Sequence, residues 1–166
     1  MTTRVAIVSD THLRDSSRLP RQVSELIAGA DLAIHAGDIS SAEVLDEIAA
    51  LGTPLRAVCG NVDSAEVRAR VPEQLAIRIE EVEFAVIHDA GAWKDRLARL
   101  RRRFPGAGVV IFGHSHMPLH ETEGDFQIFN PGSPTQRRRA PRHTMGIAQV
   151  NGSAARLELI ALTSRE

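Results

Sequence analysis

Two histidines, His114 and His116, stand directly after the apolar run 109–112 and its closing residue, Gly113. If the backbone there is extended, side chains two residues apart point to the same face, and the two imidazoles could chelate one metal ion. The pair could equally consist of ordinary polar loop residues, because two histidines alone are weak evidence for a metal site. The rest of the chain has to distinguish these two interpretations.

Four other polar clusters also follow apolar runs that read as strands. They are Asp10 with His12, Asp38, Asn61 with Asp63, and His88 with Asp89. Any one of them could be a turn or a helix cap, since Asp and Asn are common in both. In open α/β sheets, however, ligands bind outside the carboxyl ends of the strands, so all five clusters would converge on one rim. Glycines at Gly37, Gly60 and Gly113 would let the backbone turn tightly there.

The elements that would position these clusters alternate between strands and helices in the first part of the chain. Short apolar runs at 4–9, 32–35 and 55–58 predict strands. Helical spacing of apolar residues over 23–30 and 44–49 predicts a helix between each pair of strands. This alternation indicates a parallel sheet with helical crossovers.

The later part of the chain favours antiparallel strands. Residues 75–79 and 82–87 read as a hairpin, and a helix that ends at Pro105 is predicted from the apolar spacing of Trp93, Leu97, Leu100 and Phe104. After the strand at 109–112, short strands are expected over 119–122, 126–129, 144–150 and 156–160. We therefore predict a single α/β domain over residues 1–166.

Composition restricts the class of protein. A chain of 166 residues can bury a substantial core, and its net charge of −1 gives no sign of dominant nucleic-acid binding. The single cysteine, Cys59, allows neither an intramolecular disulfide nor a cysteine-based zinc site. No apolar run approaches the roughly 20 residues that span a bilayer, and the N-terminal run breaks at Asp10, too early for a signal peptide. We expect a cytoplasmic protein without a membrane partner.

Taken together, the five clusters resemble the motifs of the calcineurin-like metallophosphoesterases. The motifs are Asp10-Thr11-His12, Gly37-Asp38, Gly60 to Asp63, the strand-end His88, and Gly113 to His116. The chain length and the segment from Phe129 to Pro134 are similar to the small single-domain bacterial and archaeal phosphodiesterase branch. The resemblance covers nearly the whole chain. It implies a four-layer α-β-β-α sandwich, in which two facing mixed β-sheets are flanked by helices and two metal ions lie at the rim.

The resemblance also implies how two divalent metal ions would be held. Asp10, His12 and His116 would bind one ion, Asn61, His88 and His114 the other, and Asp38 would bridge both. Such oxygen and imidazole ligands without a thiolate suit Mn²⁺, which we favour, or Ni²⁺, Fe²⁺ or Zn²⁺. Two ions about 3.5–4 Å apart can hold a bridging hydroxide and clamp a phosphoryl group for in-line attack. The catalytic residues would be Asp38, Asn61 and His88.

Three features depart from the family pattern. Many larger members carry, after the asparagine, a histidine thought to protonate the leaving group, and this chain has Val62 there. Esters whose leaving group needs little protonation would then be favoured. Asp89 follows His88 where small members often have glycine, and it could either weaken anion binding or orient a ligand histidine. The absence of tyrosine excludes a purple-acid-phosphatase site.

Several other polar residues are expected to take no direct part in the chemistry. His35 lies inside an apolar run and is expected in the core or in support of a ligand, and His120 and His143 are expected at structural or surface positions. Cys59 is expected to be a small buried residue. Residues 101–103 are arginines that would form the solvated end of a helix.

The leading hypothesis from the sequence is a phosphodiesterase that acts on a small phosphate ester, with a phosphomonoesterase as the nearest alternative. A non-catalytic interaction scaffold, like the retromer subunit of this fold, is disfavoured because all seven ligand positions hold competent residues. A nuclease is disfavoured because the chain has no extra capping domain and no basic surplus, so nucleic acid is not an expected partner. Arg137 to Arg139 could attract a phosphate, although a solvated loop is the simpler interpretation. A homo-oligomer is left open.

Overall fold

The computed structural model describes residues 1–14 and 17–163. The first half of the chain runs β1 (Thr3–Val8), α1 (Arg21–Ala28), β2 (Leu32–His35), α2 (Ala42–Ala50), β3 (Leu55–Ala57) and α3 (Ala65–Arg70). The second half runs β4 (Gln74–Ile79), β5 (Val82–Ile87), α4 (Arg96–Arg103), β6 (Val109–Ile111), β7 (Leu119–Glu123), β8 (Phe126–Asn130), β9 (Thr144–Asn151) and β10 (Ala154–Ala161). None of the helices in these described ranges has the length and apolar character needed to cross a membrane.

The first sheet has the strand order β10-β9-β1-β2-β3. Strands β1, β2 and β3 pair in parallel, as the alternation of strands and helices predicted. Strand β9 pairs antiparallel with β1, and β10 pairs antiparallel with β9 at the edge of the sheet. The carboxyl ends of β1, β2 and β3 therefore meet at one edge, and the loops that leave them carry Asp10, Asp38 and Asn61.

The second sheet has the strand order β4-β5-β6-β8-β7. Strands β5, β6 and β8 are parallel, whereas β4 pairs antiparallel with β5 as the predicted hairpin, and β7 pairs antiparallel with β8. The loop after β5 carries His88, and the loop after β6 carries His114 and His116.

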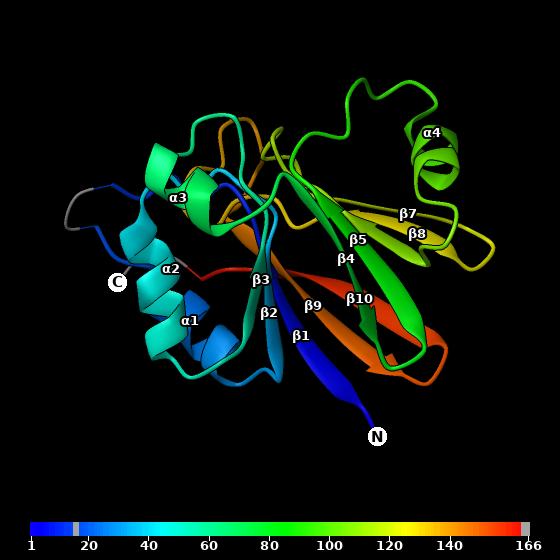
Figure 1. Cartoon of the computed structure of the whole chain (residues 1–166), viewed down its shortest axis with the longest axis horizontal. Helices are drawn as coiled ribbons and strands as arrows, with labels where there is room; N and C mark the ends of the chain where they lie inside the picture. The colour runs from blue at the N-terminus through cyan, green and yellow to red at the C-terminus, as the bar shows by residue number, and fades with distance from the viewer. Residues whose placement is uncertain (15–16, 164–166) are drawn as a thin grey trace.

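The two sheets face each other across an apolar core to which Ile7 of the first sheet and Phe84 of the second contribute. Helices α1 and α2 pack on the outer face of the first sheet through residues such as Ile27 and Ile48. Helix α4 packs on the outer face of the second sheet through Leu100, so helices lie on both sides of the sheets (Figure 1). The predicted four-layer α-β-β-α sandwich is confirmed.

Two local predictions differ from the structure. Helix α4 begins at Arg96, after Asp95 takes a left-handed conformation, so Trp93 lies outside the helix and is 81% exposed. The expected apolar stripe was therefore wrong at its first member. Helix α3 was not predicted, because its six residues bury only Val67 and are too short to show a period. It begins where the Ser64 side chain accepts a hydrogen bond from the Val67 N–H.

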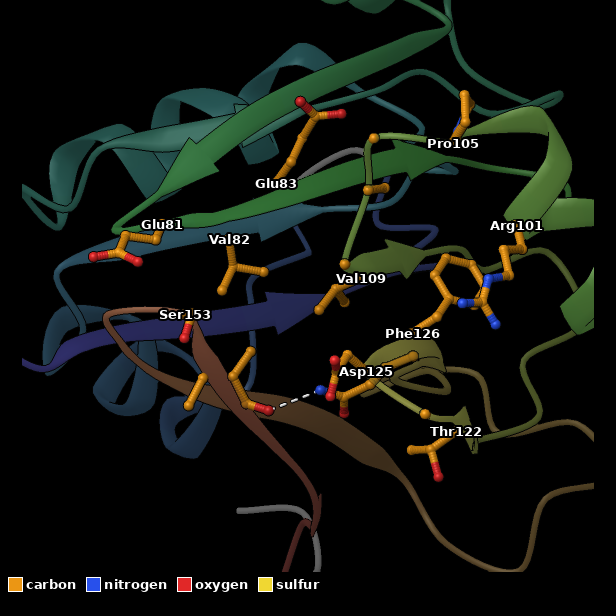
Figure 2. A pocket seen from close by; sticks show the side chains of 17 residues that line it. Glu81, Val82, Glu83, Arg101, Pro105, Val109, Thr122, Asp125, Phe126 and Ser153 are labelled. Atoms are coloured by element: carbon orange, nitrogen blue, oxygen red, sulfur yellow. Dashed lines mark hydrogen bonds between the residues drawn. The ribbon is translucent and has the colours of Figure 1, made fainter.

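The end of the sheets opposite the five polar loops holds a hollow of about 640 Å³ (Figure 2). It lies between the starts of β5, β6 and β8 and the turn that joins β9 to β10. The exposed carboxylates of Glu81, Glu83 and Asp125 line it. The Gln127 side-chain amide donates a hydrogen bond to the Ala155 carbonyl (2.8 Å) and links the two sheets there.

Candidate metal centre

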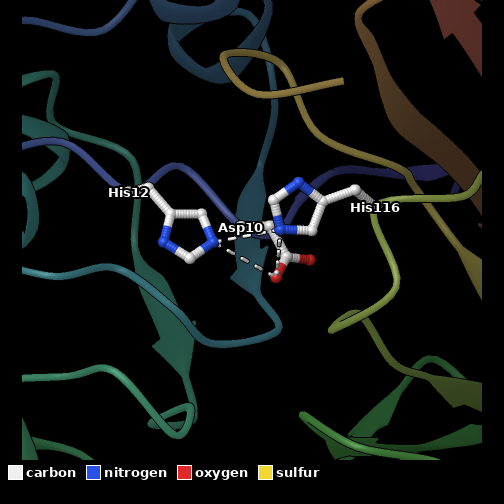
Figure 3. Close-up of side chains that lie close together, drawn as sticks. All are labelled: Asp10, His12 and His116. Atoms are coloured by element: carbon white, nitrogen blue, oxygen red, sulfur yellow. Dashed lines mark hydrogen bonds and ion pairs between the residues drawn. The ribbon is translucent and has the colours of Figure 1, made fainter. Parts of the chain in front are cut away.

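Six of the seven predicted ligands fall into two groups, in each of which the potential ligand atoms lie within 4.8 Å of one another. One group consists of Asp10, His12 and His116, and the other of Asp38, His88 and His114. Figure 3 shows the first group, with both imidazoles directed at the carboxylate. The two neighbouring histidines of the β6 loop therefore belong to different groups.

The backbone of the β6 loop explains why these histidines separate. Strand β6 ends at Ile111, and His114 and His116 have φ angles of +70° and +60°, so neither is extended. The condition under which the two imidazoles would point the same way, an extended backbone, is therefore not met, and their division between two groups is the one that the family resemblance implied. His116 is fully buried, whereas the side chain of His114 is 45% exposed.

The first group contains a buried carboxylate oxygen that lacks a partner. Asp10 Oδ1 has no hydrogen bond from any described residue, and the Asp10 side chain is fully buried. His116 Nε2 lies 3.4 Å from this oxygen, and His12 Nε2 lies 3.0 Å from His116 Nε2. A buried unpaired carboxylate oxygen is costly, and two ring nitrogens beside it offer further lone pairs. A divalent cation would satisfy all three atoms, so the residues present fit a metal.

The second group is connected to the first through Asp38. Its Oδ2 lies 3.2 Å from His88 Nε2 and 3.5 Å from His12 Nε2, so one carboxylate oxygen faces a histidine of each group. Asn61, the seventh predicted ligand, joins the second group, because its Oδ1 lies 3.2 Å from both His88 Nε2 and His114 Nδ1. All seven predicted residues are thus brought to one rim.

Backbone carbonyls orient two of the imidazoles. His88 Nδ1 lies 2.7 Å from the Ala36 carbonyl oxygen, and His116 Nδ1 contacts the Gln136 carbonyl oxygen. A carbonyl can only accept, so each Nδ1 carries a proton and each Nε2 is the ring nitrogen that faces the centre. Sequence reasoning missed Ala36 and Gln136, since a main-chain oxygen leaves no signal in residue type.

Burial and neighbouring charges shift the pKa values of three side chains in this centre. Burial alone would raise the pKa of Asp38, but the hydrogen bond and charge of His88 outweigh it and lower this pKa to about 2. Burial would lower the pKa of His88, but the Asp38 carboxylate and Asp10 raise it overall. For His116 burial prevails over the Gln136 carbonyl, and the pKa is lowered. Asp38 therefore stays ionised, and burial favours the neutral form of His116.

The loops that carry the ligands have an unusual backbone. Left-handed φ angles, which side chains with a Cβ rarely adopt, occur at five of the seven predicted ligands. These are Asp10 (55°), His12 (47°), Asp38 (54°), His114 and His116. A Cβ on Gly60 would lie 2.1 Å from Asp38 Oδ1, and one on Gly113 would lie 1.9 Å from Ser9 Oγ. Glycine is required at both positions because the backbone passes directly against the centre.

The segment after β8 holds the first ligand loop in place. The Ser133 hydroxyl donates to the Asp10 carbonyl (2.7 Å), and the Thr135 hydroxyl donates to the Thr11 carbonyl (2.5 Å). The Gln136 carbonyl next in the chain orients His116. Arg137 to Arg139 leave the rim directly after these contacts, and their side chains are exposed.

The remaining candidates occupy supporting or unrelated positions. His35 is fully buried, with Nε2 3.0 Å from the Thr11 hydroxyl and Nδ1 accepting from the Gly37 N–H, and burial lowers its pKa to about 3. It is the satisfied core histidine that the sequence suggested. Asp63 accepts from the N–H groups of Ser40 and Gly60 (both 2.6 Å) and ties two ligand loops together.

The histidines and the acidic residue left open by the sequence lie outside the two groups. His120 is exposed and pairs with Gln127 on the surface, and His143 is half-buried. Asp89 accepts from the Gly91 N–H (2.8 Å) through one oxygen, and its other oxygen lies 4.0 Å from His114 Nε2.

Comparison with known proteins identifies the family of this chain. Residues 3–153 match the calcineurin-like phosphoesterase superfamily domain. The chain is 33% identical over 157 residues to a probable metallophosphoesterase of Methanocaldococcus jannaschii, across 92% of this chain and 79% of that protein. It is 24% identical over 144 residues to a phosphodiesterase of the same archaeon, across 78% and 82% of the two chains.

Solved structures share the fold. Vacuolar protein sorting 29 of Cryptosporidium parvum has a TM-score of 0.79 at 18% identity, across 98% of this chain and 99% of that one. An archaeal phosphodiesterase has a TM-score of 0.74 at 22% identity, across 95% and 99% of the two chains. At these identities the similarity speaks to the fold alone.

Proposed function

Because this chain belongs to the calcineurin-like phosphoesterase superfamily and to its small prokaryotic branch, we propose that it hydrolyses phosphate diesters at a dinuclear metal centre. The position of Asp38 carries the proposal. One of its oxygens lies 3.2 Å from His88 Nε2 and 3.5 Å from His12 Nε2, and this position between the two groups supports a carboxylate that would be shared by two ions. A carboxylate between two dications offsets their mutual repulsion.

Each ion has its own proposed ligands besides Asp38. Asp10, His12 and His116 would hold one ion, and Asn61, His88 and His114 the other. We favour Mn²⁺ because these ligands are oxygens and imidazoles. The thiol of Cys59 is buried, and burial raises its pKa, so it remains a bystander. When bound, the two ions supply positive charge to the phosphoryl oxygens and acidify water for the attack.

The chain's own residues position the substrate. Asn61 Oδ1 faces His88 and His114, which leaves the amide N–H groups free to donate to a phosphoryl oxygen without repelling it. Val62, the next residue, is 38% exposed and cannot donate a proton to the leaving group. Diesters with weakly basic leaving groups should therefore be the better substrates, and water would protonate the others. We propose a small ester rather than nucleic acid, and a cytoplasmic location.

The test is hydrolysis of bis(p-nitrophenyl) phosphate and of p-nitrophenyl phosphate by metal-stripped protein titrated with Mn²⁺, Ni²⁺, Fe²⁺ or Zn²⁺. We expect Mn²⁺-dependent turnover of the diester and weak turnover of the monoester. Asp38→Asn should lower the diester rate on the order of a thousandfold. This corresponds to about 4 kcal/mol of lost transition-state stabilisation, at about 1.36 kcal/mol for each factor of ten. The matched control, Asp125→Asn at the opposite end of the sheets, should keep the wild-type rate.

Other outcomes would support other functions. Faster turnover of the monoester would make the protein a phosphomonoesterase. Failure of all four metals to support hydrolysis of either ester would contradict an enzymatic role and favour a protein-interaction scaffold.

A further inference from the structure

A second hollow, of about 440 Å³, adjoins the ligand group that contains His88. Asn61, His88 and His114 form part of its lining, so it opens directly beside the phosphoryl position proposed above. From there it extends to two arginines, Arg68 of helix α3 and Arg103 at the end of helix α4. Its volume is within the range of pockets that bind small molecules.

Arg68 is held rigidly and keeps its charge. Its Nη2 donates to the Gly60 carbonyl (2.7 Å), and its Nε donates to the Asp63 carbonyl (3.2 Å). Both acceptors are neutral, and they belong to the loop that carries Asn61. The guanidinium is thereby fixed beside the Asn61 loop, and it forms no ion pair with a carboxylate of residues 1–14 or 17–163.

Arg103 ends helix α4, which packs on the second sheet, and it too is held by a neutral acceptor. Its Nη2 donates to the neutral side-chain oxygen of Gln74 (3.0 Å). In the described ranges 1–14 and 17–163, the arginines that form ion pairs are instead Arg21, Arg70 and Arg101. Two cations without an acidic partner therefore lie at the outer side of the hollow.

Two carboxylates also line this hollow. Asp89 is directed toward His114, at 4.0 Å, and accepts a hydrogen bond from the Gly91 N–H. Glu73 is exposed and shares the lining with the arginines. An anion that binds to the arginines would be repelled by Glu73, so removal of this charge should strengthen binding.

We infer that this hollow is a subsite for one ester arm of the substrate, and that Arg68 and Arg103 select an arm bearing a second oxyanion, a carboxylate or phosphate. The inference rests on the proposed function, since it takes the adjoining ligand group as the position of the reacting phosphate. Guanidinium groups with free N–H donors bind carboxylate and phosphate through charge-assisted hydrogen bonds.

The experiment measures binding by calorimetry to the Mn²⁺-loaded protein. The ligands are butyl phosphate and 3-carboxypropyl phosphate, which have equally long chains and differ in the terminal carboxylate, with propane-1,3-diyl bisphosphate as the phosphate counterpart. We expect the two compounds with an anionic arm to bind about fivefold more tightly than butyl phosphate, as one exposed ion pair allows. The better of the two identifies the oxyanion.

The variants separate the subsite from general charge effects. Arg103→Ala should abolish the preference, whereas Arg102→Ala, one residue away on the same exposed helix end and outside the hollow, should keep it. Glu73→Gln should increase the preference. Arg68 is left unchanged because it also holds the Asn61 loop.

The inference is overturned if wild-type protein binds all three compounds equally, or if Arg103→Ala weakens all three alike. Failure of the proposed function would be recognised separately, because bis(p-nitrophenyl) phosphate has no anionic arm, and both the wild-type protein and Arg102→Ala, which lies outside the hollow, should hydrolyse it whether or not the subsite exists. Hydrolysis of that diester without any preference for an anionic arm would refute the subsite alone.

Discussion

The two ends of the facing sheets hold their polar side chains in different ways. At the amino ends of β5, β6 and β8, the larger hollow of about 640 Å³ is lined by exposed carboxylates such as Glu83 (Figure 2). At the carboxyl ends, Asp10 and His116 are fully buried, and Asp10 Oδ1 has no partner among the described residues. Buried and convergent polar atoms, rather than the volume of a hollow, therefore mark the candidate metal centre.

The turns at the two ends differ as well. Gly124, beside the larger hollow, has a left-handed φ of 58°, but a Cβ there would have no neighbour within 4 Å. At the ligand rim, a Cβ on Gly60 would collide with Asp38. The turn at Gly124 only connects two strands, whereas the turn at Gly60 brings the backbone into contact with Asp38 of the candidate metal centre.

The largest expected effect of a change outside the ligands is that of Gly60→Ala. The added Cβ would lie 2.1 Å from Asp38 Oδ1 and 2.4 Å from Asp38 N, so Asp38 must move. A displacement of about 1 Å can reduce activity on the order of a hundredfold. The measurement is Mn²⁺-dependent diester hydrolysis together with bound metal content.

Gly124→Ala is the matched control for this prediction. It should cost about 1 kcal/mol of unfolding free energy through its left-handed φ and leave hydrolysis intact. Equal losses of activity in the two variants would contradict the difference between the two ends.

The two histidines of the β6 loop should differ in their effect on stability. His116 is fully buried between Asp10 and the Gln136 carbonyl, so His116→Ala leaves that carbonyl without its imidazole partner and opens a cavity, and it should lower the unfolding free energy by about 1–3 kcal/mol. The side chain of His114 is 45% exposed, and His114→Ala should change the unfolding free energy by less than about 0.5 kcal/mol. Urea denaturation of the metal-stripped variants measures this, and metal content should fall in both. Similar destabilisation by both would be inconsistent with the burial.

His35 should make the stability of the metal-stripped protein depend on pH. Burial lowers its folded pKa to about 3 from an ordinary value of 6.5, so the unfolded chain binds the proton first as pH falls. The contribution of neutral His35 to the unfolding free energy is complete above pH 6.5 and is lost as the pH falls from 6.5 to 3. Over this range the unfolding free energy falls by up to about 1.4 kcal/mol per pH unit. His35→Asn should flatten this slope in denaturation from pH 7.5 to 4.5, and His120→Asn on the surface should not.

The smallest expected effect belongs to the larger hollow. Glu83→Gln removes a charge there, far from the ligand rim, and the diester rate should stay within about twofold of wild type. A steady-state assay beside Gly60→Ala provides the comparison. A marked change in rate would indicate that the two ends are coupled.

Local pattern was sufficient for most elements. The strand at 32–35 was predicted with the bounds that β2 has in the structure. A short apolar run between polar segments is typical of a buried strand and is too short for a helix. Helix α3 and the start of α4 were not predicted correctly, since Val67 is the one buried residue of α3 and Trp93 is exposed despite its helical spacing.

The sequence by itself determined which residue types follow each strand, and parallel strand order then requires those loops to meet at one rim. Only the tertiary structure decided how they meet. The left-handed turns at His114 and His116 send neighbouring side chains into different groups, and Gln136, 20 residues further along, fixes the orientation of His116. Backbone carbonyls and φ angles depend on packing between distant segments, and residue identity does not encode them locally.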